Sequence, residues 1–156
     1  MRVNCVVAVV IGMVVLSCAS QPQYRDLPSV TSTAAASPFE VPDAFEARYR
    51  AASAAATLFH VRFDQRNYSR IFAAADDSFR AATTEAAFTA RLAALRDRVG
   101  ASRSEDELRV EIGERGQDLI ITIVLETIFD NATLVETFTW RVTPTEQPFL
   151  VRYDTR

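Results

Sequence analysis

Apolar residues recur along the chain with two different periods, and the period changes at Gly100. From Asp43 to Val99 they recur every three or four residues, the spacing that gathers side chains on one face of an α-helix. From Leu108 to Tyr153 they alternate with polar residues, as in a β-strand with one buried face. The pattern predicts an α+β domain over residues 43–156, with helices first and strands afterwards.

Three helices are predicted before Gly100. Asp43 and Glu46 fit a capping box at the start of the first helix. The second helix is expected to end at Asp76-Asp77, and Thr83 or Thr84 can cap the third. The apolar stripes of the three helices are Phe45, Tyr49, Ala52, Ala56, Phe59 and Phe63, then Tyr68, Ile71, Phe72 and Ala75, then Phe88, Leu92, Leu95 and Val99.

Four strands are predicted after the helices. The longest is the apolar run Leu119–Phe129, which is typical of a strand buried on one face and partly covered on the other. Leu108–Ile112 precedes it across a turn at Gly113–Gly116, and Leu134–Val142 and Phe149–Tyr153 follow. Because turns this short join antiparallel neighbours, we expect the three helices to pack on a curved four-stranded antiparallel meander.

The N-terminal sequence predicts that the protein is located in the cell envelope. Residues 1–17 are interpreted as a signal peptide, because Arg2 precedes an apolar run, Cys5–Leu16, that is shorter than the roughly 20 residues of a membrane span. Val15-Leu16-Ser17-Cys18 resembles the lipobox of bacterial lipoproteins. The resemblance implies that Cys18 becomes the lipidated first residue of the mature chain. The alternative is an ordinary leader that is cut after Ala19.

Residues 18–42 carry the lipidated cysteine and a stretch rich in Ser, Thr, Ala and Pro, which predicts a disordered tether. Removal of the leader and acylation of Cys18 leave no free thiol, which excludes disulfide scaffolds, thiol catalysis and cysteine metal sites. Acylated lipoproteins carry several acyl chains, which anchor the protein stably to a membrane. By the sorting habits of such lipoproteins, Ala19-Ser20 after the cysteine indicates the outer membrane, with the domain in the periplasm.

The charge pattern argues against nucleic acid as a partner. The formal net charge is −3, and the 17 basic residues are all Arg and are interspersed with 20 acidic ones, so no basic face is predicted. The complete absence of Lys, together with abundant Ala, is typical of a GC-rich bacterial gene. No metal or cofactor motif is present. The expected partners are the membrane, through the lipid, and either a second copy of the chain or another envelope protein.

Loose motifs lie along Phe45–Tyr153. They are Asn67-Tyr68, Phe79 before Thr83-Thr84-Glu85, Leu92, Leu95 and Arg96 leading to Gly100, Val135-Glu136-Thr137, and Leu150-Val151-Arg152-Tyr153. Together with the order of three helices and a sheet, they resemble the cystatin-like, nuclear-transport-factor-2-like cone folds. The closest likeness is to small bacterial envelope proteins of unassigned function. The resemblance implies a pocket between the first helices and the concave sheet, and it implies no reaction.

Few ionisable residues are candidates for chemistry. His60, the single histidine, is interpreted as a boundary surface or capping residue, with a general base as the alternative. Glu126 and Glu136 are expected at a strand end or rim; the alternative is a place inside the cone, where burial would raise the pKa. Asp76-Asp77 are interpreted as helix-end acids. Arg96 with one of the strand acids would form a structural ion pair.

Two candidate binding surfaces follow from the apolar pattern. Ile120, Val124 and Ile128 point away from the other apolar residues of their strand, so they are expected to form a contiguous exposed patch for a homodimer or partner. A group of aromatic residues is interpreted as core, or alternatively as the lining of a pocket for a small apolar ligand. That group is Tyr68, Phe72, Phe88, Trp140 and Tyr153.

The sequence favours a lipid-anchored envelope protein with a non-catalytic binding or interaction domain. One alternative is a carrier that holds a small apolar ligand in the cone. The other is a cone-type enzyme that uses a buried carboxylate, with Glu126, Glu136 and His60 as its only candidates. A filled cone would favour the first function, a dry aromatic cavity the carrier, and a polar cavity lined by acids the enzyme.

Overall fold

The computed structural model describes residues 43–156, in which helices precede strands as the sequence predicts. The signal peptide 1–17, Cys18 and the tether 18–42 lie outside the described residues. Among the described helices, none is long and apolar enough to cross a membrane. The elements are α1 (Asp43–Asp64), α2 (Tyr68–Ala73), α3 (Asp77–Ala82), α4 (Glu85–Val99), β1 (Ser102–Arg115), β2 (Asp118–Phe129), β3 (Thr133–Val142) and β4 (Pro148–Thr155).

The helical half contains one helix more than predicted. α2 ends at Ala73, before the predicted Asp76-Asp77, and Asp76 instead starts α3: its backbone is extended, and its carboxylate accepts a hydrogen bond from the Ser78 N–H at 2.9 Å. The prediction of three helices is therefore wrong, because an acid that follows one helix can cap the next. At α4 the predictions are confirmed: Thr84 accepts from the Ala87 N–H, and Gly100 follows the last turn with a φ of 84°.

The sheet is a simple antiparallel meander in the order β1-β2-β3-β4, which confirms the α+β class. β1 is much longer than the predicted Leu108–Ile112, because its polar first half also pairs with β2. The predicted turn at Gly113–Gly116 is too long: Gly113 to Arg115 belong to β1, and Gly116, with a φ of 66°, makes the reversal.

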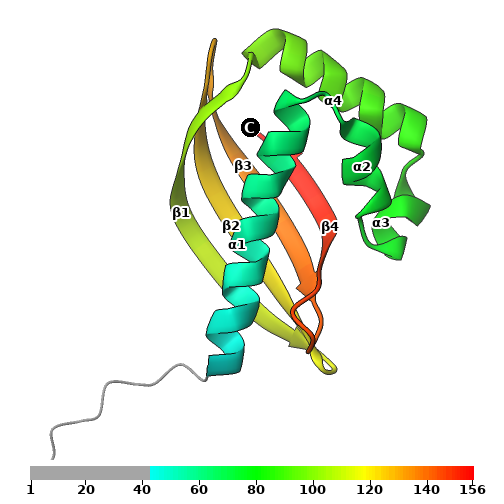
Figure 1. The fold of residues 1–156 in the computed structure, drawn as a ribbon, viewed down its shortest axis with the longest axis vertical. Coiled ribbons are helices and arrows are strands. Elements are labelled where there is room, and N and C mark those ends of the chain that lie inside the picture. Colours follow the sequence, from blue (N-terminus) through cyan, green and yellow to red (C-terminus); the bar gives the residue numbers. More distant parts are fainter. Residues whose placement is uncertain (1–42) are drawn as a thin grey trace, which may run out of the picture. The chain divides into compact units, whose positions relative to one another are not determined.

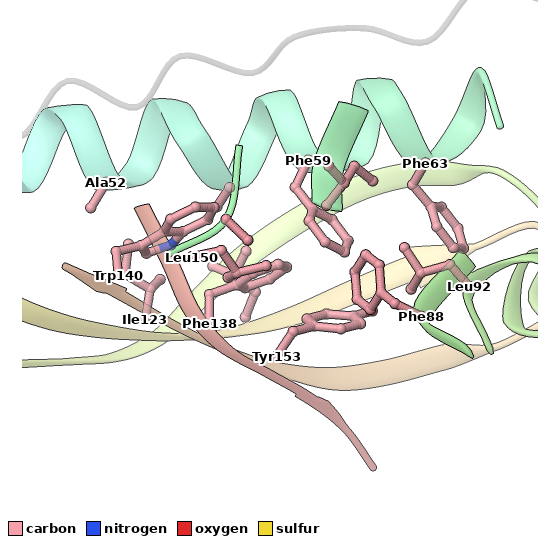
Figure 2. Close-up of a cluster of buried hydrophobic side chains, with 14 of the residues drawn as sticks. Ala52, Phe59, Phe63, Phe88, Leu92, Ile123, Phe138, Trp140, Leu150 and Tyr153 are labelled. Carbon is pink, nitrogen blue, oxygen red and sulfur yellow. The ribbon is translucent and has the colours of Figure 1, made fainter. Parts of the chain in front are cut away.

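α1 lies lengthwise against one face of the sheet, and α2, α3 and α4 gather on its β4 side (Figure 1). We call the sheet face beneath α1 the inner face. Aromatic side chains from α1 and from the inner face pack together: Phe59 meets Phe138 edge to face at 5.1 Å and lies tilted against Tyr153 at 4.6 Å, measured between ring centroids (Figure 2). The space between helix and sheet is therefore filled by side chains.

Candidate functional site

One cluster of ionisable side chains is buried between α1 and the sheet. His60 comes from α1, Glu105 from β1, Glu136 from β3 and Tyr153 from β4. We call these four residues the His60 network. Thr127 of β2 lies beside Glu105 in the strand register, so each strand places one polar residue here.

Strand alternation explains why these residues face inward. Even-numbered positions of β3 from Glu136 onward point at the helices, and those after Glu136 are the buried Phe138, Trp140 and Val142. His60 lies one helical turn after Ala56 on α1, which is also buried. His60 and Glu136 therefore lie on the faces of α1 and β3 that pack into the core.

The contacts inside the network are short and use both oxygens of Glu136. His60 Nε2 lies 2.7 Å from Glu136 Oε2, and the Tyr153 hydroxyl donates to Glu136 Oε1 at 2.5 Å. On the other side of the ring, His60 Nδ1 lies 2.8 Å from Glu105 Oε1. The imidazole thus lies between two carboxylates.

These contacts fix the charges of the buried groups. Burial by itself would lower the pKa of His60, but hydrogen bonding and charge from Glu105 and Glu136 raise it to about 9. Burial would raise the pKa of Glu136, and the hydrogen bonds and charge of His60 outweigh it, so that this pKa is lowered. Burial and the Glu136 charge raise the pKa of Tyr153 well above its ordinary value. At neutral pH the network therefore holds His60 as an imidazolium, Glu136 as a carboxylate and Tyr153 as a neutral phenol.

The network has the ingredients of acid–base chemistry, but three of its four side chains are closed off from solvent, and only Glu105 is partly exposed, at 24%. His60 is 2% exposed, Glu136 0% and Tyr153 3%. Rings of Phe129 and Phe138 lie 6.2 and 5.6 Å from the imidazole, measured between centroids, and close its remaining sides. A general base must come within hydrogen-bonding distance of the proton that it removes. In this arrangement, the groups within hydrogen-bonding distance of His60 and Glu136 are other side chains of the protein.

Two sequence interpretations are wrong here. His60 is a core residue and not a boundary or capping residue, because it lies inside the apolar stripe of α1. Glu136 is not at a rim, and its pKa is lowered, not raised, because His60 and Tyr153 are bonded to it. Glu126 lies on the opposite face of β2 from Thr127 and is half-buried, so the structure does not bring Glu126 and Glu136 together.

The other predicted acids and the arginine form structural pairs. Asp76 caps α3 and also accepts from Arg141 Nε at 2.7 Å. Burial alone would raise its pKa, but hydrogen bonds from Ser78 and Arg141 lower it to about 2. Arg96 pairs with Asp64 at the end of α1, at 3.5 Å, and not with a strand acid. In the described part of the chain, no three His, Cys, Asp or Glu side chains are grouped to hold a metal.

The aromatic residues proposed as pocket lining are mostly core. Tyr68, Phe88, Trp140 and Tyr153 are buried, and Phe72 packs partly buried against them. Trp140 does reach the wall of a hollow of about 240 Å³ between α1, α2 and the start of β4. Other walls of this hollow are Leu58, Phe59, Ile71 and Leu150.

The candidate interaction face lies on the side of the sheet away from α1, as its alternation predicts. It is not the contiguous exposed patch that was expected. Ile128 is 42% exposed, but Val124 is only 4% exposed between its register neighbours Arg109 and Thr137. Thr122 and Thr139 are hydrogen-bonded to each other on the same face, which makes its centre partly polar.

Glu105 is the one member of the network that the sequence analysis missed. It lies in the polar first half of β1, where no apolar alternation marks a strand. His60 and Glu136 carried a usable signal, since each is a polar residue in the middle of an otherwise apolar stripe.

In three comparisons with known proteins, no family model, no curated protein and no solved structure matches this chain.

Proposed function

We propose that the chain is a lipid-anchored cell-envelope protein whose α+β domain is a non-catalytic binding or interaction module. The observation that carries the proposal is the closure of the His60 network. Its most reactive groups, His60 and Glu136, are bonded to one another and are at most 2% exposed. A filled core with internally paired charges suits a protein that acts through its surface.

The proposed anchor is the lipidated Cys18, reached by cleavage after residue 17. Its support is the apolar run Cys5–Leu16 followed by Val15-Leu16-Ser17-Cys18. The proposed place is the outer membrane, with the domain facing the periplasm, and the proposed partner is a second copy or another envelope protein.

The proposed fold family is the cystatin-like, nuclear-transport-factor-2-like cone. The order of helices and then an antiparallel meander, with α1 across one face of the sheet, supports it (Figure 1). Members of a fold family differ in function, so the likeness adds no activity to the proposal.

The experiment follows radiolabelled palmitate in bacteria that express the full chain. We expect label in the wild-type protein, its recovery in the outer-membrane fraction, and loss of both in the Cys18→Ser variant. The matched control is Cys5→Ser, which changes the other cysteine and should leave labelling intact because that residue leaves with the leader. Equal labelling of wild type and Cys18→Ser would contradict the anchor.

A second candidate function, the carrier, is favoured by one observation. The hollow beside Trp140 has apolar walls such as Leu58 and polar ones, Arg62 and Gln147, and the Trp140 indole N–H is buried without a hydrogen-bond partner. Since the chain has a single Trp, its fluorescence reports on this hollow. Titration of the full chain with a medium-chain fatty acid should change the emission if the hollow takes such a ligand, and Leu58→Phe, which obstructs the mouth without adding a second Trp, should abolish the change.

A further inference from the structure

The two edge strands of the sheet, β1 and β4, differ in the hydrogen bonding of their outward backbone groups. On β4 the outward backbone carbonyls are already used: Leu150 accepts from the Asp76 N–H and Tyr153 accepts from Arg91 Nη2, both at 2.9 Å. On β1 only the first residue is held, by a hydrogen bond from the Ser102 N–H to Asp64 at 3.0 Å. β1 is therefore the open edge.

The open part of β1 is long. Within the described residues, the backbone of Arg103–Arg115 makes no hydrogen bond except to β2, and nearly all of its side chains are exposed. A register shift between Glu107 and Arg109 interrupts it. A regular stretch of strand, Arg109–Arg115, remains beyond the shift. Natural proteins cover or blunt edges of this length, unless the edge serves to pair with another chain.

Beside this stretch lies a groove with an apolar floor. Val110 and Ile112 lie opposite the core residues Ile123 and Ile121 in the register, so they point to the α1 side of the sheet. Ile112 is 45% exposed, and with Phe45 and Tyr49 of α1 it lines a hollow of about 240 Å³. A strand added to β1 would direct every second side chain into this groove.

Carboxylates flank the apolar floor. Glu114 lies on the same face as Ile112 and lines the adjoining hollow together with Phe45 and Arg48. Arg48 donates to the Gln117 carbonyl at 3.0 Å, and no ion pair joins Glu114 to another described residue. At the other end, Glu107 accepts a hydrogen bond from the Tyr49 hydroxyl at 2.7 Å. On the opposite face of β1, positive and negative charges are paired, since Arg109 Nε lies 3.4 Å from Glu111 Oε1.

A second copy of the chain has few good registers on this edge. An antiparallel self-pairing centred on Gly113 would set Glu111 opposite Arg115, but it would also set Ile112 opposite Glu114. One centred on Val110 would set Arg109 opposite Glu111, but it would use only the start of the regular stretch. In a pairing centred on Ile112, Arg109 would lie opposite Arg115 of the other copy, and a pairing centred on Glu111 would set that residue against itself. Like charges directly opposite each other destabilise a strand pair.

We infer that the β1 edge, Arg109–Arg115, is a docking site for an extended segment of a partner protein with two alternate apolar residues flanked on the same face by Lys or Arg. In the complex, the two apolar side chains of the partner segment pack on Val110 and Ile112, and one of its Lys or Arg residues pairs with Glu114. This inference rests on the proposed function and names the partner chemistry of that interaction module.

The test uses two fluorescent peptides and the full chain in detergent. One peptide is Lys-Thr-Val-Thr-Ile-Thr-Lys, and the other replaces both Lys by Glu. We expect the Lys peptide to bind at least about tenfold more tightly, a difference of about 1.4 kcal/mol. We also expect it to slow amide hydrogen exchange in Arg109–Arg115. Glu114→Lys should reverse the preference, whereas Glu111→Lys, the same change on the opposite face, should leave it.

Three outcomes of the peptide experiment overturn the inference. They are equal affinity for the two peptides, no binding at about 1 mM peptide, and exchange protection elsewhere than on β1. A dimer in sedimentation that Ile112→Lys dissociates would also overturn it, since a second copy would then occupy the edge. Protection on another surface would leave the proposed interaction module standing, and loss of palmitate labelling would remove the anchor without affecting the peptide result.

Discussion

His60 Nε2 lies 2.7 Å from Glu136 Oε2, and this contact joins the last turns of α1 to the central strand β3 inside the core. It pairs a cation and an anion that would each be costly to bury alone. Tyr153 completes the hydrogen bonding of Glu136, and Glu105 provides a second negative partner for His60. The network therefore stabilises the helix against three strands and takes His60, Glu136 and Tyr153 out of reach of solvent.

The first prediction concerns stability against pH. The pKa of His60 is raised from 6.5 to about 9 on folding, so the folded state binds the proton more tightly than the unfolded chain. The resulting stabilisation is complete below about pH 6.5 and is lost as the pH rises through 9. We expect the free energy of unfolding to fall by on the order of 3 kcal/mol over that window.

Urea unfolding at a series of pH values checks this prediction. In His60→Gln the slope between pH 6.5 and 9 should disappear, while the variant is less stable than the wild type at neutral pH. A wild-type protein whose unfolding midpoint is constant across this window would contradict the assignment of His60 as a buried imidazolium.

The second prediction concerns the aromatic core. Phe59 is 2% exposed and touches the rings of Phe63, Phe138 and Tyr153. Phe59→Ala should lower the free energy of unfolding by about 3–5 kcal/mol, because it leaves a cavity. The neighbouring Leu58 is 44% exposed, and Leu58→Ala should cost less than about 1 kcal/mol. Similar losses for the two variants, measured by chemical denaturation, would contradict the placement of this helix face.

The third prediction concerns the passage from α4 to the sheet. Gly100 has a φ of 84°, and a Cβ there would lie 2.4 Å from Asp130 Cβ. Gly100→Ala therefore combines backbone strain with a clash and should cost more than about 2 kcal/mol. Gly116 has a φ of 66° with nothing within 4 Å of the added atom, so Gly116→Ala should cost only about 1 kcal/mol. Thermal unfolding of both variants would show the difference, and equal melting temperatures would rule out the close approach of Asp130.

Regular periods made most of the fold predictable. The stripe that includes Ala52 and Phe59 fixed the long helix, and the alternation around Phe138 and Trp140 fixed β3, because burial of one face leaves a direct trace in the sequence. The polar half of β1 left no such trace, since an edge strand with exposed faces needs no apolar residues. Asp76 was ambiguous for another reason: one acid both follows α2 and caps α3.

The candidate site was harder to predict than the fold. His60 and Glu136 are 76 positions apart in the sequence, and only their elements' packing brings them together. A polar residue in an apolar stripe indicates that it has a buried partner, but it does not identify that partner. Glu105 shows the limit clearly, since neither its strand nor its inward direction is visible in the local sequence.

The most direct test of the closed network is an NMR titration of the His60 ring, whose signal is unique because the chain has one histidine. A network that is closed and charged predicts a single protonation step with a midpoint near pH 9, and a lower midpoint in Glu136→Gln. A midpoint near 6.5 that Glu136→Gln leaves unchanged would contradict it: the imidazole would then be unpaired, as a group open to solvent and substrate would be.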